Sequence, residues 1–204
     1  MAPMAEATIT RRQQRAHATS ELLLVAARQV FEQRGYQATT VGAITAAAST
    51  AHGTFYLYFK NKEDVFARVF ARMVAELEQE SSVPWQGDAR ATIRRAVSGY
   101  FAVVTRHRGL WRCLMEGIYQ SPSIEAMWLE LRRPFIDRVV KTLPATGPCG
   151  LDRPLDARAV AVALCSMVEW TAYTVVELGE PAEIGQQRAV EAVVDLWYAA
   201  IHGS

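Results

Sequence analysis

The sequence is poor in the residues that build metal centres, disulfide frameworks and nucleophilic active sites. Its three cysteines, Cys113, Cys149 and Cys165, are odd in number and form no CxxC pair, which favours structural thiols in a reducing compartment over a disulfide framework. The four histidines are widely separated, and no acidic or histidine spacing suits a metal ion. No nucleophile is paired with a base. We therefore predict no metal, no cofactor and no enzymatic activity; the alternative is a helical enzyme that uses Glu116 or Glu169 beside aromatic side chains.

Long charge-free apolar runs are also missing. The first fifteen residues contain no apolar run long enough for a signal peptide, and no later stretch of bilayer length is free of charge. The strongly apolar segment over residues 157–178 carries Glu169 near its middle. We therefore predict a soluble, cytoplasmic protein without a membrane span. With 204 residues, half of them apolar, the chain can bury a substantial core.

The net charge of +1 hides an uneven distribution. Residues 1–62 hold seven Lys and Arg against three Asp and Glu, a net charge of +4. Residues 63–204 hold fifteen against eighteen, a net charge of −3. A basic N-terminal end indicates an anionic partner for that end of the protein.

Apolar residues recur at helical spacing along most of the chain, and no stretch alternates with the period of two that indicates a strand. Leu23, Ala27 and Phe31 mark a first helix, which Gly35 is expected to end. Thr40 is expected to cap a short second helix. Further helices are expected over residues 52–58, 62–79, 88–107, 109–119, 123–143, 156–178 and 184–202. The predicted fold is therefore all-α with about nine helices.

Residues 36–64 have the pattern of a helix-turn-helix, in which a short helix, a tight turn and a second short helix pack on a preceding helix. The predicted inner face consists of Ile44, Ala47, Phe55 and Phe59. In this motif the outer face of the second helix is free to contact base edges. The side chains expected to point outward are those of His52, Gly53, Thr54 and Tyr56.

The segments GYQATTV and AITAAASTAHGTFYLYFKNKEDVF closely resemble the tetracycline-repressor (TetR) family of bacterial regulators, whose usual size this chain also has. The resemblance implies phosphate contacts by Thr40 and Tyr56. It implies that Ala51, His52, Gly53 and Thr54 approach base edges. Lys62, together with the free N–H groups at the start of its helix, is implied to meet another phosphate. Arg11 and Arg12 would follow the DNA backbone or enter the minor groove.

The sequence departs from the family's usual pattern at three positions. Ser49 stands where the family has glycine at the turn, Ala51 where it has serine, and His52 where it has lysine. We expect a weaker N-cap on the recognition helix and altered base contacts. These departures bear on the operator sequence more than on the fold.

The C-terminal end has the features of a dimer interface. The last helix places Val190, Val193, Val194, Trp197 and Ile201 on one apolar stripe. The resemblance implies that the last two helices meet their symmetry mates in a four-helix interface. A homodimer would present two recognition helices to major-groove faces about 34 Å apart on palindromic double-stranded DNA. We divide the chain into a flexible basic arm (1–19), a helix-turn-helix DNA-binding domain (20–62) and a ligand-binding and dimerisation domain (63–204).

Large, soft side chains are dense between these two ends, as in a pocket for an apolar ligand or an ordinary core. The layouts WTAY near residue 170 and LWYAAIHG at the end resemble the ethionamide-resistance repressor subgroup, whose pockets are long and aromatic. The candidate ligand contacts are Trp111, Met115, Tyr119, Trp128, Phe135, Met167, Trp170, Tyr173 and Trp197. Of these, Trp128, Phe135, Tyr173 and Trp197 are the preferred ones.

Together these features predict a one-component transcription regulator. As a repressor, it would leave its operator when a small apolar or aromatic effector favours a state in which the two readers are mis-spaced. An activator would have the same sequence features. The alternatives are a DNA-binding regulator controlled by a protein partner and one without any effector.

Overall fold

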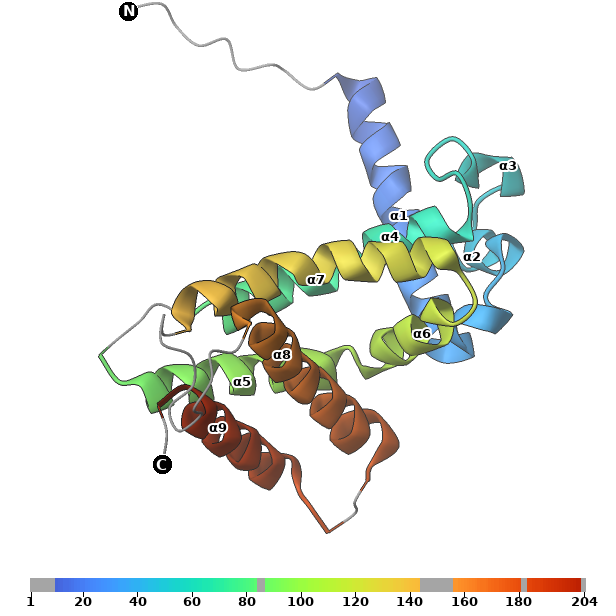
Figure 1. The fold of residues 1–204 in the computed structure, drawn as a ribbon. Helices are drawn as coiled ribbons and strands as arrows, with labels where there is room; N and C mark the ends of the chain where they lie inside the picture. The colour runs from blue at the N-terminus through green and yellow to red at the C-terminus, as the bar shows by residue number, and fades with distance from the viewer. Residues whose placement is uncertain (1–9, 84–86, 144–155, 181–182, 203–204) are drawn as a thin grey trace, which may run out of the picture.

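The computed structural model describes residues 10–83, 87–143, 156–180 and 183–202, and this part of the chain is helical without strands (Figure 1). Its elements are α1 (Arg11–Ala38), α2 (Val41–Ala47), α3 (His52–Phe55), α4 (Lys62–Ser81), α5 (Ala89–Arg106), α6 (Arg108–Ile118), α7 (Pro122–Thr142), α8 (Ala157–Ala172), the π-helical segment η1 (Tyr173–Leu178) and α9 (Gln186–His202). Segment η1 continues α8 directly. The all-α prediction is confirmed.

Helix α1 begins earlier than the sequence indicated. Thr10 caps it by accepting a hydrogen bond from Gln13 N, and the Gln13 side chain accepts one from Thr10 N in return, which is a capping box. The prediction of a flexible arm over 1–19 is therefore wrong for residues 11–19, which form the helical part that projects from the body in Figure 1. Residues 1–9 lie outside the described part of the chain. The regular helix is interrupted at Gly35, where φ is 78° and ψ is 174°.

Helices α1–α3 and the start of α4 form the N-terminal domain, which the sequence predicts to bind DNA and which is called the reader domain below. It packs around aromatic side chains. Phe31 of α1 and Phe66 of α4 are completely buried, and their rings meet edge-on with centroids 5.0 Å apart. Tyr36 packs against both rings. Edge-to-face contacts of this kind add to the stabilisation from burial alone.

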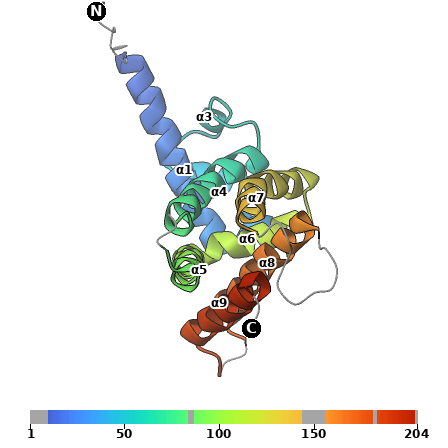
Figure 2. The same cartoon turned by 60° about the vertical axis from the view of Figure 1, so that its left-hand side comes forward.

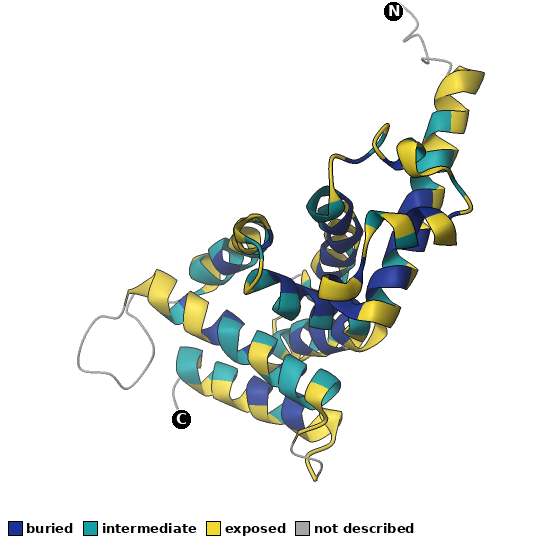
Figure 3. Cartoon of the chain, turned by 90° about the vertical axis from the view of Figure 1, so that its right-hand side faces the viewer, coloured by how far each residue is buried: buried dark blue, intermediate teal, exposed yellow. Residues whose placement is uncertain are grey.

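The predicted inner face of the helix-turn-helix is confirmed at Ile44, Phe55 and Phe59, which are all buried. It is wrong at Ala47, which is exposed, while Ala48 takes the inward position. Ala48 follows Ile44 by four residues and therefore shares its face, whereas Ala47 points about 100° away from Ala48. Figure 3 shows this small domain with buried inner faces and exposed outer ones.

Helices α4–α9 form the larger C-terminal domain, which the sequence predicts to bind a ligand and which is called the sensor domain below. Helix α5 packs against α4 and α9, and α7 packs against α4, α6 and α8. Figures 1 and 2 show α8 and α9 side by side at the end of the molecule opposite α3. Trp111 lies at the centre of the core, 1% exposed, with its ring 5.4 Å from that of Trp128 and 5.9 Å from that of Tyr100.

Within the described ranges, the helical segment Ala157–Leu178 is long and apolar enough to cross a membrane by length and composition. The core helix of a soluble protein passes the same test. Two acidic side chains of this segment are largely buried and paired: Glu169 with Arg132 of α7 at 2.7 Å, and Glu177 with Arg112 of α6 at 3.2 Å. These pairs tie the segment to α7 and α6.

Candidate DNA interface and apolar cavity

The turn between α2 and α3 contains Ser49 and Ala51, two of the residues at which the sequence departs from the family's usual pattern. Thr40 caps α2 as expected, accepting a hydrogen bond from Ala43 N at 3.1 Å. Ser49 adopts a φ of 51°, the left-handed region in which a glycine costs least. Ala51 occupies the N-cap of α3 without a side-chain hydrogen bond. The weaker cap expected from the sequence is therefore present.

The outer face of α3 is open to solvent. His52 and Gly53 are exposed, Thr54 is half-buried, and Tyr56, directly after the helix, is 54% exposed. The rings of His52 and Tyr56 meet at 5.6 Å. A β-carbon added at Gly53 would meet nothing within 4 Å, so the chain's own packing does not require a glycine there.

The basic residues expected to contact DNA differ in their surroundings: Lys62 has a partner within the chain, whereas Arg11 and Arg12 are exposed. Lys62 opens α4, but its Nζ donates to the Tyr36 carbonyl at 3.0 Å and lies 4.3 Å from the centre of the Tyr36 ring. An ammonium has three donors, so two N–H groups are left for a phosphate. Arg11 and Arg12 are exposed at the start of α1, on a helix rather than on a flexible arm.

An apolar cavity of about 310 Å³ lies between α4, α5, α7, α8 and α9. Its apolar wall includes Val74, Leu77, Ile93, Val97, Trp128, Leu131, Phe135, Val139, Val168, Trp197 and Ile201. The volume falls at the lower end of the range of small-molecule sites. The described residues include no cluster of three side chains suited to a metal ion.

Three of the nine candidate ligand contacts line this cavity: Trp128, Phe135 and Trp197. Trp111 packs against Trp128 without lining the cavity. Met115, Met167 and Tyr173 are partly buried outside it. Tyr119 and Trp170 are 88% and 59% exposed, so these two side chains lie on the surface of the chain.

The cavity lining also has polar groups that were not among the candidate ligand contacts. Arg132 donates to Glu169 Oε1 at 2.7 Å and to Ser166 Oγ at 2.6 Å. Burial raises the pKa of Glu169, although the hydrogen bond and charge of Arg132 act in the opposite direction. The hydroxyl of Tyr100 is buried without a hydrogen-bond partner in the described protein. Cys165 at the same wall is a free, buried thiol, and so is Cys113 in α6; Cys149 lies outside the described residues.

Helix α6 lies very close to the second half of α1. A β-carbon on Gly109 would stand 3.1 Å from Glu32 Cγ, and one on Gly117 would stand 3.1 Å from Ile124 Cγ2 and 3.5 Å from the Tyr36 ring. The two distances of 3.1 Å are tighter than ordinary van der Waals contact, whereas 3.5 Å is an ordinary contact. The two glycines therefore let α6 approach the reader domain and α7 more closely than any larger residue would allow.

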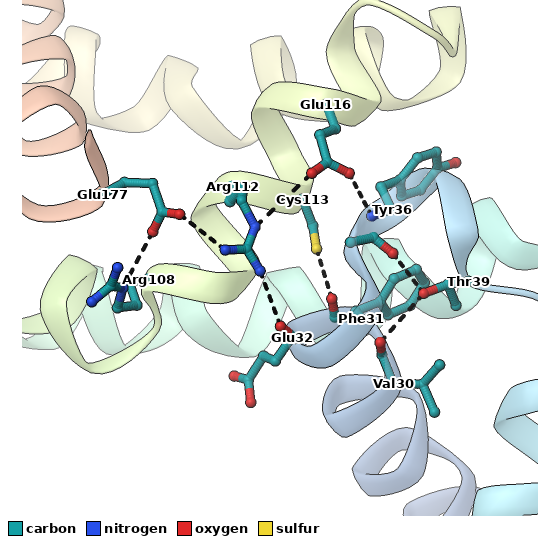
Figure 4. Close-up of polar contacts among 11 residues, drawn as sticks. Val30, Phe31, Glu32, Tyr36, Thr39, Arg108, Arg112, Cys113, Glu116 and Glu177 are labelled. Atoms are coloured by element: carbon teal, nitrogen blue, oxygen red, sulfur yellow. Dashed lines mark hydrogen bonds and ion pairs between the residues drawn. The ribbon is translucent and has the colours of Figure 1, made fainter.

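Polar contacts lock this junction (Figure 4). Glu116 of α6 accepts a hydrogen bond from Tyr36 N at 2.7 Å. Arg112 donates to the Glu32 carbonyl at 3.1 Å and to Glu177 Oε1 at 3.2 Å. Glu177 belongs to η1, and its side chain is only 6% exposed. The contacts therefore run from η1, at the end of α8, through α6 to the end of α1.

A second connection passes through His107, which is 2% exposed between α5 and α6. Its Nδ1 lies 2.9 Å from Arg28 Nη2, and its Nε2 lies 2.8 Å from Glu76 Oε2. A guanidinium can only donate, so Nδ1 accepts and Nε2–H donates to the carboxylate. His107 thereby joins α1, α4 and the α5–α6 junction.

Comparison with known proteins gives one family match in the N-terminal part of the chain and one in the C-terminal part. Residues 23–69 match the family model of the bacterial regulatory proteins of the tetR family, and residues 93–203 match that of the C-terminal domain of the transcriptional regulator EthR. A TetR-like transcriptional regulator from Rhodococcus sp. RHA1 has 25% identity and a TM-score of 0.66, with 91% of this chain and 97% of that chain covered.

Two curated relatives each match only part of the chain. The HTH-type transcriptional regulator YhgD of Bacillus subtilis is 39% identical over 30% of this chain and 32% of its own length. The HTH-type transcriptional repressor DhaR of Mycobacterium sp. is 31% identical over 52% of this chain and 54% of its own length. The chain thus spans less than two thirds of these relatives. With one family model covering more than half of it, the chain belongs to the TetR family of transcriptional regulators and has a C-terminal domain of the EthR type.

Proposed function

We propose that this protein is a sequence-specific DNA-binding repressor that a small, mainly apolar effector releases from its operator. The observation that carries this proposal is the uncovered outer face of α3, with His52, Gly53 and Tyr56 exposed beside a capped α2. A helix that contacts base edges in a groove needs such a free outer face. Arg11, Arg12, Thr40, Ala51, Thr54 and Lys62 complete the proposed interface. We keep residues 20–62 as its DNA-binding domain, and 63–204 as the sensor.

The effector site in this proposal is the cavity of the sensor domain. Trp128, Phe135 and Trp197 are its proposed aromatic contacts, and Trp111 supports Trp128 from behind. Tyr119 and Trp170 are not part of the proposed site, because both side chains are exposed on the surface. A coupling of about 1–3 kcal/mol between cavity and reader would change operator affinity about 5- to 150-fold. Relatives named as regulators give no support to the enzyme alternative.

The proposed dimer interface is the outer face of α8 and α9. It does not include the apolar stripe of α9 expected from the sequence, because Val190, Val193 and Val194 are buried within the chain and Trp197 and Ile201 line the cavity. Val162 and Trp170 of α8 and Leu196 of α9 are 37%, 59% and 61% exposed, and a second copy would bury them in a twofold four-helix contact. The same burial accounts for the apolar length of Ala157–Leu178 without a membrane. Two subunits would read a palindromic operator in the cytoplasm.

Replacing Leu196 by arginine should raise the dimer dissociation constant about 100-fold or more, because an unpaired guanidinium would be desolvated at the interface. Sedimentation equilibrium measures this constant. The control is Leu22→Arg, since Leu22 is 49% exposed on α1 in the reader domain. Circular dichroism should show both variants folded. A Leu196→Arg protein that still forms the wild-type dimer would place the interface elsewhere.

Mobility-shift titrations on DNA from upstream of the protein's own coding sequence test the function as a whole. We expect two chains per palindromic site, no comparable shift with scrambled half-sites, and affinity that falls when an apolar compound is added. Absence of any site-specific shift would contradict the regulator proposal. A specific shift that no apolar compound alters would favour control by a protein partner, or no effector.

A further inference from the structure

Tyr100 of α5 belongs to the lining of a mainly apolar cavity and carries a polar group without a partner. The side chain lines the cavity, its residue is 9% exposed, and its hydroxyl is fully buried with no hydrogen-bond partner among the described protein groups. The Trp111 ring, 5.9 Å away and nearly perpendicular, holds the phenol ring from behind. A buried hydroxyl without a partner is costly, and a ligand in this cavity can supply one.

The other polar groups of the inner wall do not meet this hydroxyl, and their charges cancel. Arg132 is engaged by Glu169 and Ser166, and the Arg132 and Glu169 side chains are only 13% and 17% exposed. Burial raises the pKa of the Cys165 thiol to about 12, so it is neutral at physiological pH. Burial also raises the pKa of Tyr100, and the negative charge of Glu169 adds to this effect. The hydroxyl therefore keeps its proton and can donate.

Neither arginine of the cavity lining is free to bind an anionic ligand. The third basic residue of the lining, His202, is exposed at the end of α9, and its ring packs against that of Tyr198. A carboxylate placed near Arg132 would also meet the carboxylate of Glu169. Arg138 lines the cavity as well, but it pairs with Glu78 at 3.2 Å and its side chain is 39% exposed, which places its charge near solvent. These balanced charges disfavour a ligand with a net charge of its own.

On the basis of the function proposed above, we propose that Tyr100 determines effector specificity: its hydroxyl donates a hydrogen bond to the single acceptor of a neutral, otherwise apolar effector. A volume of about 310 Å³ lies at the lower end of the range of small-molecule sites, about 300–1,000 Å³. The effector class is thus a medium-sized neutral molecule with one carbonyl or ether oxygen. A hydrocarbon would leave the hydroxyl unpaired, and a carboxylate would be desolvated without a counterion.

Three probes of nearly equal shape test this inference by calorimetry on the full-length protein: valerophenone, pentylbenzene and 5-phenylpentanoate. The wild-type protein should bind valerophenone at least about fivefold more tightly than pentylbenzene, and at least about tenfold more tightly than 5-phenylpentanoate. Tyr100→Phe should raise the Kd for valerophenone about five- to tenfold and leave that for pentylbenzene within about twofold.

The matched control is Tyr173→Phe, because Tyr173 is partly buried outside the cavity; it should leave all three affinities unchanged. Tyr100→Phe removes an unpartnered hydroxyl, so it should not lower the melting temperature of the free protein. Equal affinities for valerophenone and pentylbenzene, or an unchanged valerophenone affinity in Tyr100→Phe, would overturn the role of Tyr100 while leaving the cavity as an effector site. Binding of none of the probes to the wild-type protein would overturn both.

Discussion

Replacing Gly35 by alanine should lower the free energy of unfolding by about 3 kcal/mol. Gly35 combines a φ of 78° with a ψ of 174°, a region that glycine alone adopts readily and in which other residues lose about 1–3 kcal/mol. The added β-carbon would also stand 2.7 Å from Glu116 Oε2, the atom that accepts the hydrogen bond from Tyr36 N. For a chain of this size, the melting temperature should fall by about 6–12 °C. Urea and thermal unfolding measure both quantities.

A double-mutant cycle separates the two causes. In a Glu116→Ala background the carboxylate is gone, so Gly35→Ala should cost only the backbone strain, about 1–3 kcal/mol. Gly185→Ala is the control, because a β-carbon there would meet nothing within 4 Å. If Gly35→Ala unfolds like the wild-type protein, the break in α1 at this residue is not a fixed part of the fold.

Replacing Gly53 by glutamine should weaken operator binding about 10- to 100-fold and leave the fold intact. Gly53 is exposed on α3, and the space around its Cα is empty in the free chain. Stability should therefore change by no more than about 0.5 kcal/mol. In the proposed complex that space belongs to DNA, and a long side chain would push the recognition helix out of the groove at the cost of one or more base contacts, worth about 1–3 kcal/mol each.

Fluorescence anisotropy with a labelled operator at fixed salt measures this loss, and salt must be held constant because phosphate contacts depend on it. The matched control is Gly185→Gln in the loop before α9, far from the reader domain. Binding to unrelated DNA should change less than operator binding. Wild-type operator affinity in Gly53→Gln would show that α3 does not read bases through this face.

The parts of the fold that could be predicted from sequence depend on local chemistry. Thr40 was recognisable as an N-cap because a short polar side chain precedes an apolar helix, and it accepts the expected backbone hydrogen bond. The start of α1 was missed because residues 11–19 lack apolar periodicity, and the Thr10 capping box with Gln13 is a weaker signal than a hydrophobic stripe.

The cavity could be predicted only in part, because lining it is a property of the tertiary arrangement. Trp111 and Trp128 are both large and largely buried, yet only Trp128 borders the cavity. Trp170 faces outward on the same helix whose Cys165 and Val168 face inward. The hydroxyl of Tyr100 has no sequence signal at all, since its lack of a partner depends on five different helices.

The close fit of Gly109 and Gly117 against their neighbours has a mechanical consequence. Two helices that touch nearly backbone to backbone, and that are pinned by Glu116 and Arg112 as well, cannot slide past one another without steric overlap. Helix α6 and the second half of α1 should therefore move as one rigid unit. Glu177 of η1 contacts this unit through α6, and α3 is attached to it through the reader domain. A tilt of α6 at its contact with η1 would then rotate the whole reader domain, including α3.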